Sequence, residues 1–307
     1  MNRQPVLRGM IPCIHQGKVR DTYALPGFPD KRLIYVTDRV STHNVLHESM
    51  VSDKGTILLA MTLFWEKLLK EAKGTYTHTV AIGQEIYRYL PRGYTYPADL
   101  HLRAIVVQTV RMFPYEFIYR GRMAGSLYKD YYSQGKANPY GVKFPEGMQL
   151  MDEFPQPIFT PTDKSETDEP IDPKTMKDLK GSDITVPQGI YTFMRSYALK
   201  RGIDIIDTKL ELGLHDGRRT LADEWGTPDS SRFVDATSIM RGEEPRWLDK
   251  QFLREEAEVI WKQEGRGKFP LAFSPQAIQE TVGRYHEVVE RLTGQSLPVL
   301  QESLGLT

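Results

Sequence analysis

The sequence has very little cysteine and no long apolar run. Cys13 is the single cysteine among 307 residues, so no internal disulfide can form, and no Cys/His cluster has zinc-ligand spacing. No segment approaches the roughly 20 apolar residues of a membrane span. The N-terminus MNRQPVLRGM also lacks the apolar stretch of a signal peptide. These absences predict a soluble, cytoplasmic protein without a membrane partner.

An excess of charge of either sign is also missing. The 40 basic and 40 acidic residues cancel, whereas a nucleic-acid or acidic-membrane partner would require a surplus of Lys and Arg. No Ser/His/Asp catalytic triad can be recognised. No heptad repeat is present either, so the sequence leaves open whether the chain is a monomer or a homo-oligomer. A chain of this length buries a large core and has the size of an enzyme.

Apolar periodicity and turn residues predict a mixed α and β protein. The stretch 138–172 is rich in Pro and Gly and too long for an ordinary connector, so it is either a linker or a working loop. The predicted elements are a β-rich part over 17–45, a helix over 56–72, two strands over 102–119 broken near Pro114, a short helix over 124–135, a helix over 187–201 after Pro187, a hairpin of 206–213 with 220–225 across the Asp216-Gly217 turn, and helices over 245–265 and 274–293.

The strand IDTKLELG, residues 206–213, carries charge on one face. Alternation places Asp207, Lys209 and Glu211 opposite the apolar side. The hairpin brings Glu211 near Asp223, and two neighbouring carboxylates repel unless a cation lies between them. Mg²⁺ is usually held by one or two carboxylates together with substrate phosphates. The face is therefore either a metal–nucleotide site or an ordinary solvated surface with a salt bridge.

The segment DEWGTPDSSRF, residues 223–233, admits two interpretations. It can be a turn that leads into a helix capped by Ser230 or Ser231. It can instead be a binding loop, in which Asp229 accepts sugar hydroxyls and Arg232 holds a phosphate through its guanidinium.

Two segments combine glycine with basic residues. QGKVRDTY offers Gly17, Lys18 and Arg20, where glycine lets backbone N–H groups approach a phosphate. It lacks the full Walker pattern, so an exposed strand edge is the alternative. YRGRMAGSLYKDY offers Arg120 and Ser126 before a helix, which indicates either an anion site or a helix cap with surface arginines.

Taken together and in this order, GKVRDTY, DRVS, RGRMAGS, FTP followed by Lys164, IDTKLELG, DEWGTPDSSR and DKQFLR resemble the SAICAR synthetase family over about residues 15–295. The resemblance implies an α+β, two-lobed fold with a small antiparallel β-rich lobe (1–112), a larger α/β lobe (113–307), and ATP with Mg²⁺ in the cleft between them. It implies that ATP phosphorylates the carboxylate of a phosphorylated imidazole substrate, CAIR. The amine of L-aspartate then displaces phosphate from the acyl phosphate to give SAICAR.

The same resemblance implies roles for individual residues. The assignments are Gly17, Lys18 and Arg20 over the ATP phosphates; Lys209, Glu211, Asp223 and Lys164 as catalytic residues, with Glu211 and Asp223 on Mg²⁺ and Lys209 and Glu211 also on the nucleotide; Arg120, Ser126 and Arg232 on the substrate 5′-phosphate; Asp207 and Asp229 near its ribose; and Ser41, Asp168, Lys250 and Arg254 on the substrate side.

Two segments depart from the family pattern. Ser41-Thr42-His43-Asn44 stands where the family has Ser-Ala-Phe-Asp, and 166–170 is shorter than the family's Gly-Glu-His-Asp-Glu-Asn and lacks its histidine. Asn44 and Thr167 therefore favour, as an alternative, a paralogue that activates another heteroaromatic carboxylate or uses another amine. A catalytically inactive nucleotide-binding module is a further alternative, against which Lys209, Glu211 and Asp223 argue.

Overall fold

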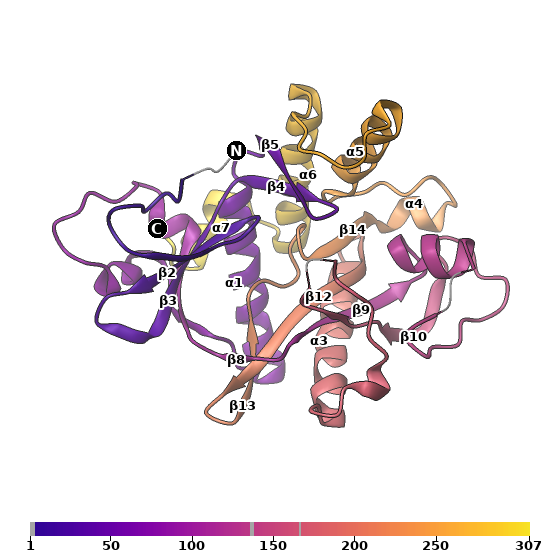
Figure 1. Cartoon of the computed structure of the whole chain (residues 1–307), viewed down its shortest axis with the longest axis horizontal. Helices are drawn as coiled ribbons and strands as arrows, with labels where there is room; N and C mark the ends of the chain where they lie inside the picture. Colours follow the sequence, from indigo (N-terminus) through magenta and orange to yellow (C-terminus); the bar gives the residue numbers. More distant parts are fainter. Residues whose placement is uncertain (1–3, 136–137, 166) are drawn as a thin grey trace.

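The computed structural model describes residues 4–135, 138–165 and 167–307 (Figure 1). Its strands are β1 (Cys13–Gln16), β2 (Arg20–Leu25), β3 (Phe28–Val36), β4 (Arg39–Thr42), β5 (Val45–Met50), β6 (Thr79–Ala81), β7 (Ala104–Gln108), β8 (Arg111–Met112), β9 (Tyr115–Arg122), β10 (Glu153–Phe159), β11 (Thr162–Asp163), β12 (Ile203–His215), β13 (Arg218–Ala222) and β14 (Ser231–Asp235).

The α-helices are α1 (Lys54–Lys73), α2 (Leu100–Arg103), α3 (Gly181–Leu199), α4 (Ala236–Met240), α5 (Gln251–Glu264), α6 (Pro275–Thr293) and α7 (Leu297–Ser303). Short 3₁₀ helices cover Gly83–Tyr89 and Pro173–Thr175, and a π-helical stretch covers Leu127–Ser133. Among these described helices, none combines the length and the apolar character that a bilayer crossing requires. The cytoplasmic location stays a prediction.

The strands form antiparallel sheets, which confirms the predicted α+β class. The first sheet has the order β1-β2-β3-β7-β6, and the second has the order β10-β9-β12-β13. In the second sheet β11 pairs with β9, while β8 and β14 pair with β12. The hairpin β4-β5 is separate. The long strand β12 is therefore the centre of the second sheet, and it runs through the middle of the molecule (Figure 1).

Helix α1 joins the two sheets through one core. Its residues Ile57, Met61 and Trp65 are almost fully buried and belong to a cluster that includes Val107 of the first sheet and Leu210 of the second. The helix contacts β3, α3, α6 and α7 (Figure 1). The sheets change between Gln108 and Arg111, close to the predicted lobe boundary after residue 112. Because the core is shared, the division into 1–112 and 113–307 stays a prediction.

The predicted hairpin forms with the expected turn. Strand β12 pairs with β13 in a register that sets Glu211 opposite Ala222. Asp216 and Gly217 have φ values of 49° and 72°, and positive φ at both central turn positions is typical of the type I′ turn that Asp-Gly favours. Asp223 follows β13 directly, so its carboxylate is carried toward the charged face of β12.

One local prediction is wrong, and two of the alternatives left open are excluded. Helix α3 begins at Gly181 and contains Pro187, because the Asp183 carboxylate accepts the N–H of Lys180 at 2.7 Å and caps the helix before the proline. Residues 231–235 form a strand instead of a capped helix, since they pair with β12 along its edge. The stretch 138–172 contains β10 and β11, which pair with β9, so it is no linker.

Candidate active site

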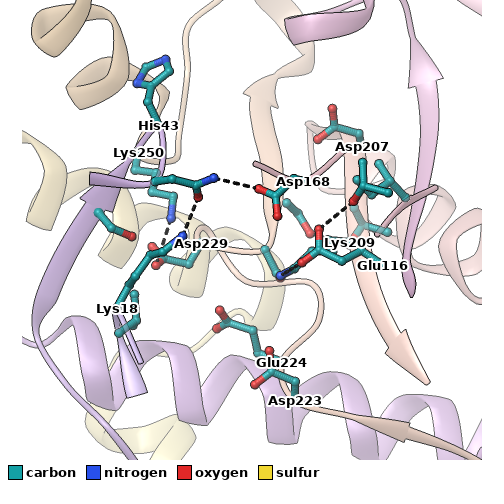
Figure 2. A pocket seen from close by; sticks show the side chains of 18 of the residues that line it. Lys18, His43, Glu116, Asp168, Asp207, Lys209, Asp223, Glu224, Asp229 and Lys250 are labelled. Carbon is teal, nitrogen blue, oxygen red and sulfur yellow. Dashed lines mark hydrogen bonds and ion pairs between the residues drawn. The ribbon is translucent and has the colours of Figure 1, made fainter. Parts of the chain in front are cut away.

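A cleft of about 1030 Å³ lies where β12, the β1–β2 connection and the segments before α5 meet. Figure 2 shows lysines and carboxylates from these separate segments facing the same space. The predicted residues that line it are Gly17, Lys18, Arg20, Ser41, Arg120, Ser126, Asp168, Asp207, Lys209, Asp223, Asp229, Arg232, Lys250 and Arg254. In the described part of the chain, Lys164 and Glu211 do not line the cleft, but they connect to it through Lys209.

Three arginines gather around one carboxylate at one end of the cleft. Asp207 Oδ2 accepts from Arg120 Nη1 at 2.9 Å and from Arg232 Nη1. Burial would raise the pKa of Asp207, but Arg232 and Arg120 outweigh it and lower that pKa. Burial and the adjacent Arg232 also lower the pKa of Arg254, which forms no ion pair with any described carboxylate. Asp249 is a second carboxylate near Arg254, so three guanidinium groups face two carboxylates and keep an excess of positive charge, as a phosphate site requires.

Gly125 lets the chain pass close to this arginine cluster. Its φ is +60°, and a Cβ atom built there would lie 2.5 Å from both Nη1 and Nη2 of Arg232. Ser126 precedes the π-helical stretch, but its hydroxyl makes no capping hydrogen bond. The simple helix cap proposed for Ser126 is therefore wrong, and the serine lines the cleft beside the arginines.

The charged face of β12 forms a second cluster. Lys209 Nζ donates to Glu116 Oε1 at 2.7 Å and to Glu211 Oε1 at 3.4 Å. Glu211 also accepts from Lys164. Burial would lower the pKa of Lys209, but Glu116 and Glu211 outweigh it and raise that pKa, so the ammonium stays charged. With about a third of its side chain exposed, Lys209 presents this charge to the cleft.

Arg20 links the predicted phosphate loop to the predicted metal ligand. Its guanidinium pairs with Asp223 and, at 2.5 Å, with Glu224. Burial would raise the pKa of Asp223, but Arg20 outweighs it and lowers that pKa. For Glu224 burial prevails and raises the pKa, with the carboxylates of Asp229 and Asp223 adding to it against Arg20. The Arg20 guanidinium thus holds the carboxylates of Asp223 and Glu224 close together.

Asp229 is enclosed by protein donors. Its side chain is 2% exposed, with Oδ2 at 2.9 Å from Lys54 Nζ and 3.1 Å from Lys250 Nζ. Oδ1 accepts from the Tyr285 hydroxyl at 2.8 Å. Burial, opposed by Asp229, lowers the pKa of Lys250 to about 8. Asp229 therefore positions Lys250 at the wall of the cleft. The place of Asp229 near a ribose stays a prediction.

The departures from the family pattern lie together at the mouth of the cleft. Lys18 Nζ donates to Asn44 Oδ1 at 2.6 Å, and Asn44 Nδ2 donates to Asp168 Oδ2 at 3.1 Å. An aspartate at position 44 would face Asp168 with a second carboxylate, and the two would repel. The neutral side-chain amide of Asn44 therefore accepts from Lys18 and donates to Asp168 without charge repulsion. Thr167 lines the cleft, while Glu166 lies outside the described residues.

Among the residues of the site that sequence reasoning missed are Lys54, Glu116, Glu224 and Tyr285. Lys54 gave no clear signal, because it precedes the helix predicted over 56–72, and only the structure shows it buried at the start of α1. Glu116 was a lone acid in the otherwise apolar start of β9. Tyr285 gave no signal, since a tyrosine on the apolar side of an amphipathic helix is ordinary core.

Comparisons with known proteins agree over nearly the whole chain. A family model described as SAICAR synthetase matches residues 13–266. The phosphoribosylaminoimidazole-succinocarboxamide synthase of Desulfotalea psychrophila is 38% identical over 290 residues, which cover 92% of this chain and 95% of that protein. The enzyme of the same name from Saccharomyces cerevisiae is 34% identical over 301 residues, covering 94% and 96%.

Solved structures show the same fold. The SAICAR-synthase from Saccharomyces cerevisiae complexed with SAICAR superposes with a TM-score of 0.81 at 33% identity, covering 96% of this chain and 98% of that one. A SAICAR synthetase in complex with ADP superposes with a TM-score of 0.63 at 23% identity, covering 92% and 98%. The second likeness supports the fold alone.

Proposed function

This chain belongs to the SAICAR synthetase family and is an ATP-dependent ligase of purine biosynthesis, and we propose that the cleft described above joins CAIR to L-aspartate with the following division of labour. The observation that carries this division is the pair of cationic clusters in one cleft. One is the arginine cluster Arg120, Arg232 and Arg254. The other holds Arg20 and Lys209 among carboxylates.

The Arg20 and Lys209 end receives ATP. Gly17 and Lys18 approach the phosphates from the β1–β2 connection, and Lys209 faces the transferring group from β12. The carboxylate oxygen of CAIR forms a bond to the γ-phosphorus while the bond to ADP breaks. Because phosphoryl transfer needs positioning and positive charge more than a protein nucleophile, these side chains suffice without a triad.

The arginine cluster receives the substrate 5′-phosphate. Arg120 and Arg232 are held by Asp207, and Ser126 adds a hydroxyl on the same wall. This anchor fixes the imidazole carboxylate relative to ATP. In the second step the aspartate nitrogen bonds to the acyl carbon, the bond from that carbon to the phosphate oxygen breaks, and the proton that the amine loses passes to the released phosphate. Lys250 and Asp168 lie on the substrate side of the cleft and orient the amine partner.

The carboxylates of the ATP end have the oxygen donors that Mg²⁺ prefers, and to hold the ion they would exchange their present partners, Arg20 for Asp223 and Lys164 for Glu211. Glu211 and Asp223 offer oxygen donors, and Mg²⁺ commonly takes one or two carboxylates plus phosphate oxygens and water. In the described residues no group of three His, Cys, Asp or Glu side chains could hold a metal alone, so phosphates would have to complete the shell. When bound, Mg²⁺ would neutralise the phosphate charge.

Glu211→Gln and Asp223→Asn test the metal assignment. Each variant removes one carboxylate charge at constant shape, so we expect turnover to fall at least about tenfold and the half-saturating Mg²⁺ concentration to rise. The measurement is a Mg²⁺ titration of ADP release, with calorimetric ADP binding at the same concentrations. Glu85→Gln is the control, because Glu85 is an exposed acid whose ion-pair partner among the described residues is Arg88. Unaltered Mg²⁺ dependence in both site variants would remove the assignment.

A further inference from the structure

The loop of Gly17, Lys18 and Val19 is held from behind by two residues at the start of the β4 hairpin. Arg39 Nη2 donates to the Gly17 carbonyl at 2.9 Å, and Arg39 Nε donates to the Lys18 carbonyl at 3.2 Å. The Val19 carbonyl accepts from the Thr37 N–H at 2.9 Å and from its hydroxyl at 2.6 Å. Three successive carbonyls are thus all satisfied.

This arrangement decides where the N–H groups of the loop point. A peptide N–H is directed opposite to the carbonyl of the same planar unit. Because the carbonyls of Gly17 and Lys18 both face Arg39, the N–H groups of Lys18 and Val19 face the other way. Within the described residues neither N–H has an acceptor, and Gly17 to Arg20 line the cleft. Successive free N–H groups beside an ammonium form an anion-binding nest.

Arg39 is itself rigidly held. It is 4% exposed, and Asp21 beside it is fully buried. The two pair through Nη2–Oδ1 at 2.6 Å and Nη1–Oδ2 at 3.3 Å. One planar guanidinium therefore spans the carboxylate and both loop carbonyls at once, a geometry that a lysine ammonium cannot reproduce. Neither Arg39 nor Asp21 lines the cleft.

We propose that the Arg39–Asp21 pair is a positioning device that holds the phosphate loop in its binding conformation before ATP arrives. A loop that is already ordered loses less entropy on binding, so the pair favours nucleotide affinity without touching the nucleotide. The inference rests on the proposed function, which assigns this loop to the ATP phosphates.

Arg39→Lys tests the proposal, with Asp21→Asn as a second variant that preserves side-chain size. For each we expect the KM for Mg-ATP and the calorimetric Kd for ADP to rise about tenfold, as for the loss of one or two hydrogen bonds. The KM for CAIR should change less than about twofold, because the arginine cluster is untouched. A merely structural role would move both KM values together or neither.

Arg103→Lys is the matched control. Arg103 is another largely buried arginine, it pairs with Asp38 at 3.0 Å next to Arg39, and it donates nothing to the loop. The Arg103→Lys substitution should lower the melting temperature of the protein while leaving its ADP affinity unchanged. Unchanged ADP affinity in folded Arg39→Lys or Asp21→Asn would overturn the positioning role of the pair and leave the ATP assignment of the loop intact. Failure of the unmodified protein to bind ADP would instead contradict the ATP assignment of the loop.

Discussion

Replacing Lys209 with methionine is expected to lower kcat by about a hundred- to a thousandfold, the cost of losing one preorganised charge at a transferring group. Lys209 is the cation that β12 places in the cleft, where Glu116 and Glu211 hold its ammonium in position. Methionine keeps the length of the side chain and removes only the charge. Single-turnover formation of ADP measures the effect on the chemical step directly.

Several measurements accompany the Lys209 variant. Glu211 keeps its contact with Lys164, but Glu116, whose side chain is 13% exposed, loses its cation, so the melting temperature should also fall. CAIR affinity should be unchanged, since its phosphate is assigned to the arginine cluster. Lys200→Met, at the solvent-exposed end of α3, is the control and should keep the unmodified rate. A Lys209→Met protein with more than about a third of the unmodified rate would contradict the assignment of Lys209 to the transferring phosphoryl group.

Gly125→Ala is expected to raise the KM for CAIR by about a hundredfold, because the new methyl group displaces a guanidinium from a charge-assisted phosphate contact. The built Cβ would lie 2.5 Å from the terminal nitrogens of Arg232, so the side chain must move away from the cleft wall. The KM for Mg-ATP should remain within about twofold, since the ATP end is formed by other segments.

Gly242→Ala separates this clash from backbone strain. Gly242 has a φ of +66°, against +60° at Gly125, but nothing lies within 4 Å of its built Cβ. Both variants therefore carry the same left-handed penalty of about 1 kcal/mol. Only the Gly125 variant should lose CAIR affinity. An equal KM for CAIR in the two variants would exclude Arg232 from the 5′-phosphate site.

Local patterns were enough to predict the central hairpin. The alternation in IDTKLELG and the Asp-Gly turn are properties of consecutive residues, so they indicated β12, β13 and the approach of Asp223. The same holds for Lys209 and Glu211, which share a strand face by period two. Helix α1 was recognised for a similar reason, because its apolar residues recur at helical spacing.

The contacts that organise the site depend on residues far apart in the chain. Asp229 meets Lys54 and Tyr285 only after α1 and α6 have packed into the shared core. Arg39 reaches the loop carbonyls only because β4 follows a turn after β3. No spacing rule connects such positions. The family resemblance predicted the general assignment of the cleft. It could not show that Asn44 faces Asp168, which would repel an acid at position 44.

The most direct test of the central claim is ADP release by the purified protein with Mg-ATP, CAIR and each of a panel of amino acids, including a blank without CAIR. We predict turnover that requires CAIR and is strong only with L-aspartate, which would make Asn44 and Thr167 tolerated variations of the purine enzyme. Absence of turnover with CAIR and aspartate, in a preparation that binds ATP with Mg²⁺, would contradict the account and point to another carboxylate substrate.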